Sequence, residues 1–452
     1  MTAGAARRAL ALALCASFLS GPSALAEDTR RGPWEVPPRK VALKTGIPLI
    51  FQRDEASRTT VLGIFVPGGR SAVPAGLDGL AYLAARLSLE IPDEDKVREL
   101  MGQATRLSLS CSEDFTCLLV ECLSGDFEAA LRVAAKIVQD PLLSGLRIGA
   151  AKETMKIQGR AEEDDVLLAA RNAAFRAFFR GEGYGSSTFG SDASRKAIDR
   201  KDVVAFHRRT FNDAGVFFAV ASDLDLEEIR PQLEKHFSKV PRGGGEEATP
   251  ALPAPPDGRA ITLDRETKQT YVGRAFPLPA PTAEGHAKGS LLEALLGRGP
   301  GSRLWPLRMD ERLAYDVDAR LTWTRRSGVL EAFLVTDRAK AVRAGEALDR
   351  ALAALRENGL TPEELAATKA LAKAGFLRSV ESKPGRVGLL GLFEVLGLGP
   401  EGLAGIYGPI DAVGLDAMNA YVREALDPER ALELTVGPAG AGPVQGGSPC
   451  PD

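Results

Sequence analysis

The chain has 452 residues, 44% of them hydrophobic, and its 57 basic and 60 acidic side chains leave a formal charge of −3. This is an ordinary globular composition, long enough for two domains or more, and the balance of charge speaks against nucleic-acid binding. Beyond the N-terminal segment, no stretch is long and apolar enough to cross a membrane.

Residues 1–26 have the pattern of a secretory signal peptide. Two arginines precede a short apolar core, and Ala24-Leu25-Ala26 forms a small-x-small cleavage site. The core is too short to span a bilayer as a helix, and Cys15 follows a leucine rather than a small residue, which disfavours lipoprotein processing. We therefore expect an exported chain, periplasmic if its source is a Gram-negative bacterium.

The first half of the mature chain opens with a strand predicted over residues 59–66. Val66-Pro67-Gly68-Gly69-Arg70 follows it and leads to a helix that begins with Gly79 and carries Tyr82, Ala85 and Arg86. Tyr82 and Arg86 are four residues apart and therefore share one helical face. A phenol and a guanidinium on that face cannot act as neutral nitrogen ligands for a metal.

Three cysteines lie in the next segment, where residues 107–111 and 117–123 predict two strands joined by a turn. That register could place Cys111 opposite Cys117 and allow a cross-strand disulfide in an oxidising compartment. Buried thiols that act as small hydrophobic side chains, Cys122 included, are an equal alternative. No second Cys or His pair has ligand spacing, so we expect no zinc site built from these cysteines.

A Gly- and Pro-rich linker is predicted at residues 241–258. It separates an N-terminal domain, residues 27–240, from a C-terminal domain, residues 259–440, and a disordered tail follows at 441–452. The two domains repeat one order of elements, which predicts an internal duplication of α+β domains, each a largely antiparallel sheet packed with helices. The matching elements are the strands 59–66 and 269–276, the helices 126–139 and 339–357, the long helices 146–158 and 361–382, and the strands 216–221 and 431–436.

The second half contains the most distinctive pattern of the chain. Gly301-Ser302-Arg303-Leu304-Trp305-Pro306-Leu307-Arg308 runs on through Arg312-Leu313-Ala314-Tyr315-Asp316-Val317. With the segment around Tyr82 and the pairs Tyr184-Gly185 and Phe189-Gly190, in this order and spacing, it resembles the pitrilysin/insulinase family of inverted zincins (peptidase M16). The resemblance covers nearly all of residues 41–438 and implies two homologous α+β domains arranged as a clam shell.

In this family the helix that carries Tyr82 reads G-L-A-H-x-x-E-H, in which both His bind zinc and the Glu polarises the attacking water. Here Tyr82, Ala85 and Arg86 replace all three, so the resemblance implies that this chain binds no zinc and cuts no peptide alone. The family's third ligand, a Glu, falls at or near Gln158. Carboxylates remain nearby at Glu153, Glu162 and Glu163, and solvated helix charges are their simpler interpretation. His207, His236 and His286 are scattered without ligand spacing, and we expect them to be partly exposed.

The pattern in the second half is retained. The resemblance implies that Arg308 holds substrate carbonyls and that the Tyr315 hydroxyl helps to stabilise a tetrahedral intermediate, a chemistry that suits both donors. Arg312 stands where the family commonly has Gly. The structural alternative is that Arg308 caps a helix and Tyr315 packs in the sheet.

Two functions follow from this combination. The first is the catalytically incomplete subunit of a heterodimeric zinc metallopeptidase that cleaves extended peptides, with the zinc and H-x-x-E-H on a homologous partner chain and substrate-binding Arg308 and Tyr315 on this one. The second is a structural or peptide-binding scaffold that resembles the core subunits of the mitochondrial cytochrome bc1 complex. An active peptidase with a relocated metal site is a remote third possibility.

Overall fold

The computed structural model describes residues 36–89, 102, 104–139, 141, 143–213, 215–240, 253, 258–297 and 299–440. The predicted signal peptide, most of the predicted linker, the predicted tail, Cys15 and Cys450 lie outside the described residues. Within the described part, no helix combines the length and the apolar composition needed to cross a membrane.

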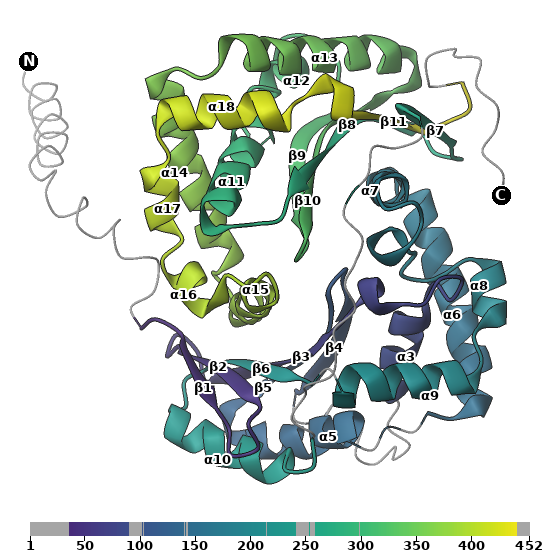
Figure 1. The fold of residues 1–452 in the computed structure, drawn as a ribbon, viewed down its shortest axis with the longest axis vertical. Coiled ribbons are helices and arrows are strands. Elements are labelled where there is room, and N and C mark those ends of the chain that lie inside the picture. The colour runs from purple at the N-terminus through teal and green to yellow at the C-terminus, as the bar shows by residue number, and fades with distance from the viewer. Residues whose placement is uncertain are drawn as a thin grey trace, which may run out of the picture.

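The N-terminal half is built on a six-stranded sheet in the order β1-β2-β6-β3-β5-β4 (Figure 1). All neighbouring strands are antiparallel except β2 and β6, which are parallel. The strands are β1 (Arg39–Ala42), β2 (Pro48–Arg53), β3 (Thr59–Pro67), β4 (Arg106–Cys111), β5 (Phe115–Leu123) and β6 (Phe217–Ser222). The helices are η2 (Arg70–Ala72), α3 (Leu80–Ser88), η3 (Ser124–Asp126), α5 (Phe127–Gln139), α6 (Gly145–Asp164), α7 (Val166–Phe178), η4 (Gly183–Gly185), α8 (Asp192–Ala197), α9 (Arg200–His207), η5 (Arg208–Asp213) and α10 (Leu226–His236).

The C-terminal half is built on a five-stranded sheet in the order β7-β11-β8-β10-β9, again with one parallel pair, β7 and β11. The strands are β7 (Ala260–Asp264), β8 (Gln269–Pro279), β9 (Asp316–Trp323), β10 (Ser327–Asp337) and β11 (Leu432–Gly437). The helices are α11 (Ala283–Gly297), α12 (Trp305–Met309), η6 (Arg338–Lys340), α13 (Ala341–Asn358), α14 (Pro362–Ser379), α15 (Lys383–Val395), α16 (Gly399–Ala404), α17 (Tyr407–Ala412), α18 (Leu415–Ala425) and η7 (Pro428–Arg430).

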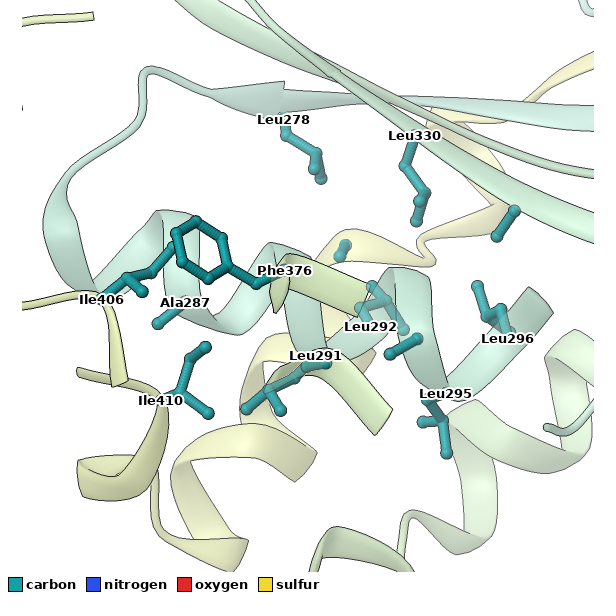
Figure 2. Close-up of a cluster of buried hydrophobic side chains, with 14 of the residues drawn as sticks. Leu278, Ala287, Leu291, Leu292, Leu295, Leu296, Leu330, Phe376, Ile406 and Ile410 are labelled. Carbon is teal, nitrogen blue, oxygen red and sulfur yellow. The ribbon is translucent and has the colours of Figure 1, made fainter. Parts of the chain in front are cut away.

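The two sheets have one topology. The order β2-β6-β3-β5-β4 corresponds strand for strand to β7-β11-β8-β10-β9, and the single parallel pair falls at the same place in both. In the C-terminal half, leucines of α11 pack between the sheet and the helices behind it, as Figure 2 shows for Leu291, Leu292 and Leu295 below Leu278 and Leu330. The predicted fold class, two homologous α+β domains with largely antiparallel sheets, is confirmed.

Helix α7 of the N-terminal half packs on the sheet of the C-terminal half, against β8 and β11. Its Ala170, Phe175 and Phe178 lie in one buried cluster with Tyr271 and Phe333. Burial of three such side chains removes a large apolar surface from water, and each aromatic ring contributes about 1.5–3 kcal/mol. The core of the C-terminal half is therefore completed by a helix from the other half.

Helix α15 makes the reciprocal contact, against β3 and β6. Its Val387 and Leu390 share a buried cluster with Phe65 and Phe217, and a Cβ atom on Gly391 would lie 2.0 Å from the Phe65 ring. Figure 1 shows α7 and α15 between the two sheets. The halves face each other as two shells, and these exchanged helices fill the space between them.

Of the two alternatives for these cysteines, the pairing of Cys111 with Cys117 is the one that the structure excludes. The register places Ser110 opposite Cys117, and Cys111 opposite Thr116. Because successive residues of a strand point to opposite faces, the two thiols lie on opposite faces of the sheet and cannot form a disulfide. Cys111, Cys117 and Cys122 are free thiols, and burial raises the pKa of Cys117 and Cys122 to about 12.

Candidate functional site

Helix α3 carries the residues that replace the zinc-binding sequence. It starts at Gly79, whose φ of 93° favours glycine and where a Cβ atom would lie 3.1 Å from the Gly190 backbone. The half-buried Tyr82 ring meets Phe189 edge-on, with 4.8 Å between centroids. Ala85 is buried and Arg86 is half-buried. The face that would carry two imidazoles therefore carries an aromatic contact between α3 and the segment that follows η4.

Zinc does not fit these residues. The ring of Tyr82 packs against Phe189, and Ala85 has no atom that could bind a metal. Arg86 is a cation whose side chain has only hydrogen-bond donors. Nowhere in the described part of the chain do three His, Cys, Asp or Glu side chains gather as a metal site would require.

Helix α6 packs against α3 and carries the predicted third-ligand position. The Oε1 atom of Gln158 is buried and has no hydrogen-bond partner in the described structure. One turn later, half-buried Glu162 accepts a hydrogen bond from Asn172 (3.3 Å), and burial raises its pKa although Asn172 and two arginines oppose the shift. Glu153 and Glu163 are exposed. Of the three neighbouring carboxylates, Glu162 is therefore the one that is partly buried.

The three histidines lie on different helices. His207, expected to be partly exposed, is buried and stacks on Phe211, because the end of α9 packs inward, and burial lowers its pKa to about 4. His286 lies between Trp323 and Phe393, where burial also lowers its pKa to about 4. The Nε2 atom of the third, His236, is 3.4 Å from the carboxylate of Glu128.

A buried ion cluster beside α3 has no counterpart in the sequence analysis. Glu113, in the turn between β4 and β5, accepts hydrogen bonds from Arg70 of η2 and Arg171 of α7. Burial on its own would raise the pKa of Glu113, but the two guanidinium groups outweigh it and hold the pKa at about 2. The cluster ties together three segments that are distant in the sequence.

Asp114, the next residue, connects the two halves. Tyr184 donates its hydroxyl hydrogen to Oδ1 of Asp114 (2.6 Å), and the backbone N–H of Arg325 donates to Oδ2 (2.7 Å). Arg325 belongs to the turn between β9 and β10 in the C-terminal half. Tyr184, noted in the sequence as part of a family motif, thus has a structural role at the junction of the halves.

Arg308 lies in the last turn of α12. Its Cζ atom is 4.9 Å from the centroid of the Trp305 ring, and the side chain is half-buried. The loop that follows is held by Leu313, whose N–H donates to the carbonyl of Leu307 (2.9 Å). Arg312 in this loop has a φ of 53°, the left-handed region that favours glycine. An arginine therefore occupies, at some strain, a backbone conformation that glycine adopts more readily.

Tyr315 immediately precedes β9. Its N–H donates to the carbonyl of Val335 (2.8 Å), and its hydroxyl donates to Asp337 (2.7 Å). The side chain is 55% exposed, so the ring does not pack in the sheet as the structural alternative supposed. The hydrogen bond to Asp337 raises the pKa of Tyr315.

Comparison with known proteins places the chain in a family. Residues 197–371 match the family described as the peptidase M16 inactive domain. This match, the full-length relatives and the fold together support assignment of the chain to the peptidase M16 family. The matched range of this M16 chain includes Arg308 and Tyr315, and it leaves Tyr82 and the rest of α3 outside.

Relatives of this M16 chain are distant in sequence. An uncharacterised zinc protease of Mycobacterium leprae is 22% identical over 396 residues, 86% of this chain and 89% of the relative. The crystal structure of a peptidase M16 inactive domain from Pseudomonas fluorescens has the same fold (TM-score 0.79, 19% identity, 89% of this chain and 98% of that one). Subunit 1 of the bovine mitochondrial cytochrome b-c1 complex is 23% identical over 209 residues, 45% of this chain and 43% of the subunit.

Proposed function

We propose that this M16 chain is the non-zinc subunit of an exported heterodimeric zinc metallopeptidase and contributes Arg308 and Tyr315 to an active site on its partner. The partner is a homologous chain with an intact H-x-x-E-H helix, and the substrates are extended peptides. The observation that carries the proposal is a contrast. On α3, Tyr82 packs against Phe189, whereas Tyr315 is 55% exposed and Arg308 is only half-buried, with no hydrogen-bond acceptor in the described part of the chain.

The fold supports a site shared between two chains. Helix α12 contacts β9 and α13, whereas α3 contacts α6, α9 and the strands β4 and β5. Figure 1 shows α12 beside α13 at the top of the molecule and α3 in the lower half. Because α7 and α15 are each packed on the sheet of the other half, the halves cannot swing together within one chain without opening two buried cores. Arg308 and Tyr315 are therefore better placed to reach an active site on a second molecule than to reach α3 of their own chain.

The chemistry of the two side chains fits this role. A guanidinium offers several N–H donors in a fixed plane, which suits the carbonyl oxygens of an extended peptide. A phenol offers one donor to the oxyanion that forms when a peptide carbonyl becomes tetrahedral. Loss of one such donor typically lowers kcat by about a hundred- to a thousand-fold.

The test is co-purification of the tagged, exported chain from its native source, followed by zinc and peptidase assays on the chain alone and on the complex. We expect the chain alone to bind no stoichiometric zinc and to cleave nothing, and the complex to contain zinc and cleave peptides. In the complex, Arg308→Ala and Tyr315→Phe should each lower kcat/KM about a hundred-fold or more.

Matched controls are available on the same half. Arg423→Ala removes an exposed arginine of α18, and Tyr407→Phe removes a buried hydroxyl that has no hydrogen-bond partner in the described structure. Both should leave kcat/KM unchanged. Full activity of the Arg308→Ala, Tyr315→Phe double variant in the complex would refute the proposal.

The second candidate is a scaffold without catalytic function, favoured by the similarity to subunit 1 of the cytochrome b-c1 complex. In that case the co-purified partners would include no chain with H-x-x-E-H, and the complex would show no zinc-dependent cleavage. The same experiment therefore separates the two functions.

A further inference from the structure

The arginines of the 301–308 segment are held in two different ways. Arg303 uses its Nη2 atom to donate to Glu364 (2.9 Å) and to the carbonyl of Gly359 (3.1 Å), which ties it into the fold. The Cζ atom of Arg308 instead lies over the ring of Trp305, 4.9 Å from its centroid. Across the part of the chain that the structure describes, its N–H groups donate to no acceptor.

These two kinds of contact differ in whether the N–H donors of the arginine remain available. A hydrogen-bonded ion pair engages N–H donors of a guanidinium, whereas a guanidinium that lies over an aromatic ring can keep N–H donors available for another partner. Trp305 itself is anchored, because it packs against the buried cluster of the C-terminal half. It lies on the same short helix as Arg308, three residues before it, so both side chains are on one face of that helix.

We propose that Trp305 is a positioning residue, which presents the N–H edge of Arg308 to the carbonyl groups of a peptide substrate. The inference rests on the proposed function of Arg308 and names what makes that arginine effective. A long side chain free to rotate loses entropy when it binds, and a guanidinium fixed beforehand in its binding orientation avoids much of that cost. Misplacement of a binding group by about 1 Å can lower a rate by about a hundred-fold.

A double-mutant cycle in the purified heterodimer tests the proposal. Trp305→Leu should lower kcat/KM about ten- to a hundred-fold, and Trp305→Phe, which retains an aromatic face, should recover much of the loss. In the Arg308→Ala background, Trp305→Leu should have no further effect, because the residue through which it acts is absent. Trp323→Phe, a tryptophan change on β9, should leave kcat/KM unchanged.

The stack itself is measured on the isolated chain. Arg308→Ala should change the tryptophan fluorescence of the wild-type chain and leave that of the Trp305→Phe variant unchanged. Circular dichroism and the melting temperature show whether the Trp305→Leu chain is folded, and the Phe variant tests the proposal if it is not.

The outcomes are distinct. Equal losses from Trp305→Leu with and without Arg308, or full activity of both Trp305 variants, would overturn the positioning role while leaving the function of Arg308 intact. If Arg308→Ala leaves the fluorescence of the wild-type chain unchanged, Arg308 and Trp305 are not in contact in solution. Full activity of Arg308→Ala itself would overturn the proposed function, and the role of Trp305 with it.

Discussion

The hydroxyl group of Tyr315 donates its single hydrogen to Asp337, although the ring is largely in solvent. Asp337 is the last residue of β10, with its backbone paired to Gln269 of β8, so the acceptor sits on a rigid strand. The ammonium group of Lys340 is 3.8 Å from the other oxygen of that carboxylate. In the isolated chain, the phenol is therefore oriented and kept protonated by a neighbour in its own half.

The pKa of this hydroxyl group gives a prediction that concerns one residue. Because the negative Asp337 disfavours a phenolate, Asp337→Asn should lower the pKa of Tyr315, with the ammonium of Lys340, which lies beside Asp337, left in place. The measurement is the tyrosinate absorbance of the isolated chain during alkaline titration, taken as the difference from the same chain with Tyr315→Phe. An unchanged titration in the Asn variant would show that Asp337 does not hold the hydroxyl in solution.

The sequence could show which residues are present at such sites but not what they contact. Replacement of the zinc-binding residues by Tyr82, Ala85 and Arg86 is visible in the sequence. The contact of Tyr82 with Phe189 is not, because it depends on how α3 and a distant segment pack. Arg312 was noted as a departure from Gly, and only the structure shows that it adopts the left-handed conformation.

At the scale of elements, the turn between β4 and β5 is held in place by a buried ion cluster. Glu113 and Arg70 are both buried, and Arg171 reaches the same carboxylate from α7. Removing one partner from a buried ion cluster leaves charge without compensation, which costs far more than losing an exposed ion pair. The turn therefore links the β4–β5 hairpin to α7, the helix that completes the opposite core.

This cluster predicts a pH dependence of stability. The pKa of Glu113 is lowered from 4.5 to about 2, so its stabilisation is fully present above the unfolded value and is lost as the pH falls toward the folded one. At neutral pH, Glu113→Gln should reduce the free energy of unfolding by about 3 kcal/mol, since one pKa unit corresponds to about 1.4 kcal/mol.

The measurement is urea unfolding of both chains at neutral pH and at successively lower pH. The gap between wild type and Glu113→Gln should narrow as the pH is lowered below 4.5. Glu153→Gln, on the exposed face of α6, is the control and should change the free energy of unfolding at neutral pH far less than Glu113→Gln does. A constant gap for Glu113→Gln would contradict the assigned cause.

The sequence predicted the elements better than their ends and pairings. The helix expected over 146–158 continues to Asp164, because no residue breaks it before Asp165 caps the next helix by accepting from the N–H groups of Leu167 and Leu168. The β4–β5 hairpin was expected in the right place, yet its register differs by one residue from the one assumed. Such a shift moves every side chain to the other face, which is why Cys111 and Cys117 cannot pair.

At the scale of the whole molecule, the duplication was readable because each half repeats one order of strands and helices. The exchange of α7 and α15 was not readable, because both helices follow the long helix of their own half and their sequences do not indicate which sheet they cover. The linker predicted at 241–258 indicated two domains, and the family resemblance implied that they face each other, but neither showed that their cores are shared. The packing instead makes each half necessary for the core of the other.

If that reciprocal packing is what holds the chain together, damage to one exchanged helix should destabilise both halves at once. Gly391→Ala places a methyl group where α15 meets Phe65, only 2.0 Å from the ring, and should lower the free energy of unfolding by about 1–3 kcal/mol. Gly388→Ala on the same helix meets nothing within 4 Å and should raise it by about 0.5–1 kcal/mol through better helix propensity. Unfolding should remain a single transition in both variants, followed by circular dichroism and by tryptophan fluorescence, because neither half keeps a complete core without the other. Two separate transitions in Gly391→Ala, with the C-terminal half melting at its wild-type midpoint, would show that the halves are independent and that they could close on each other within one chain.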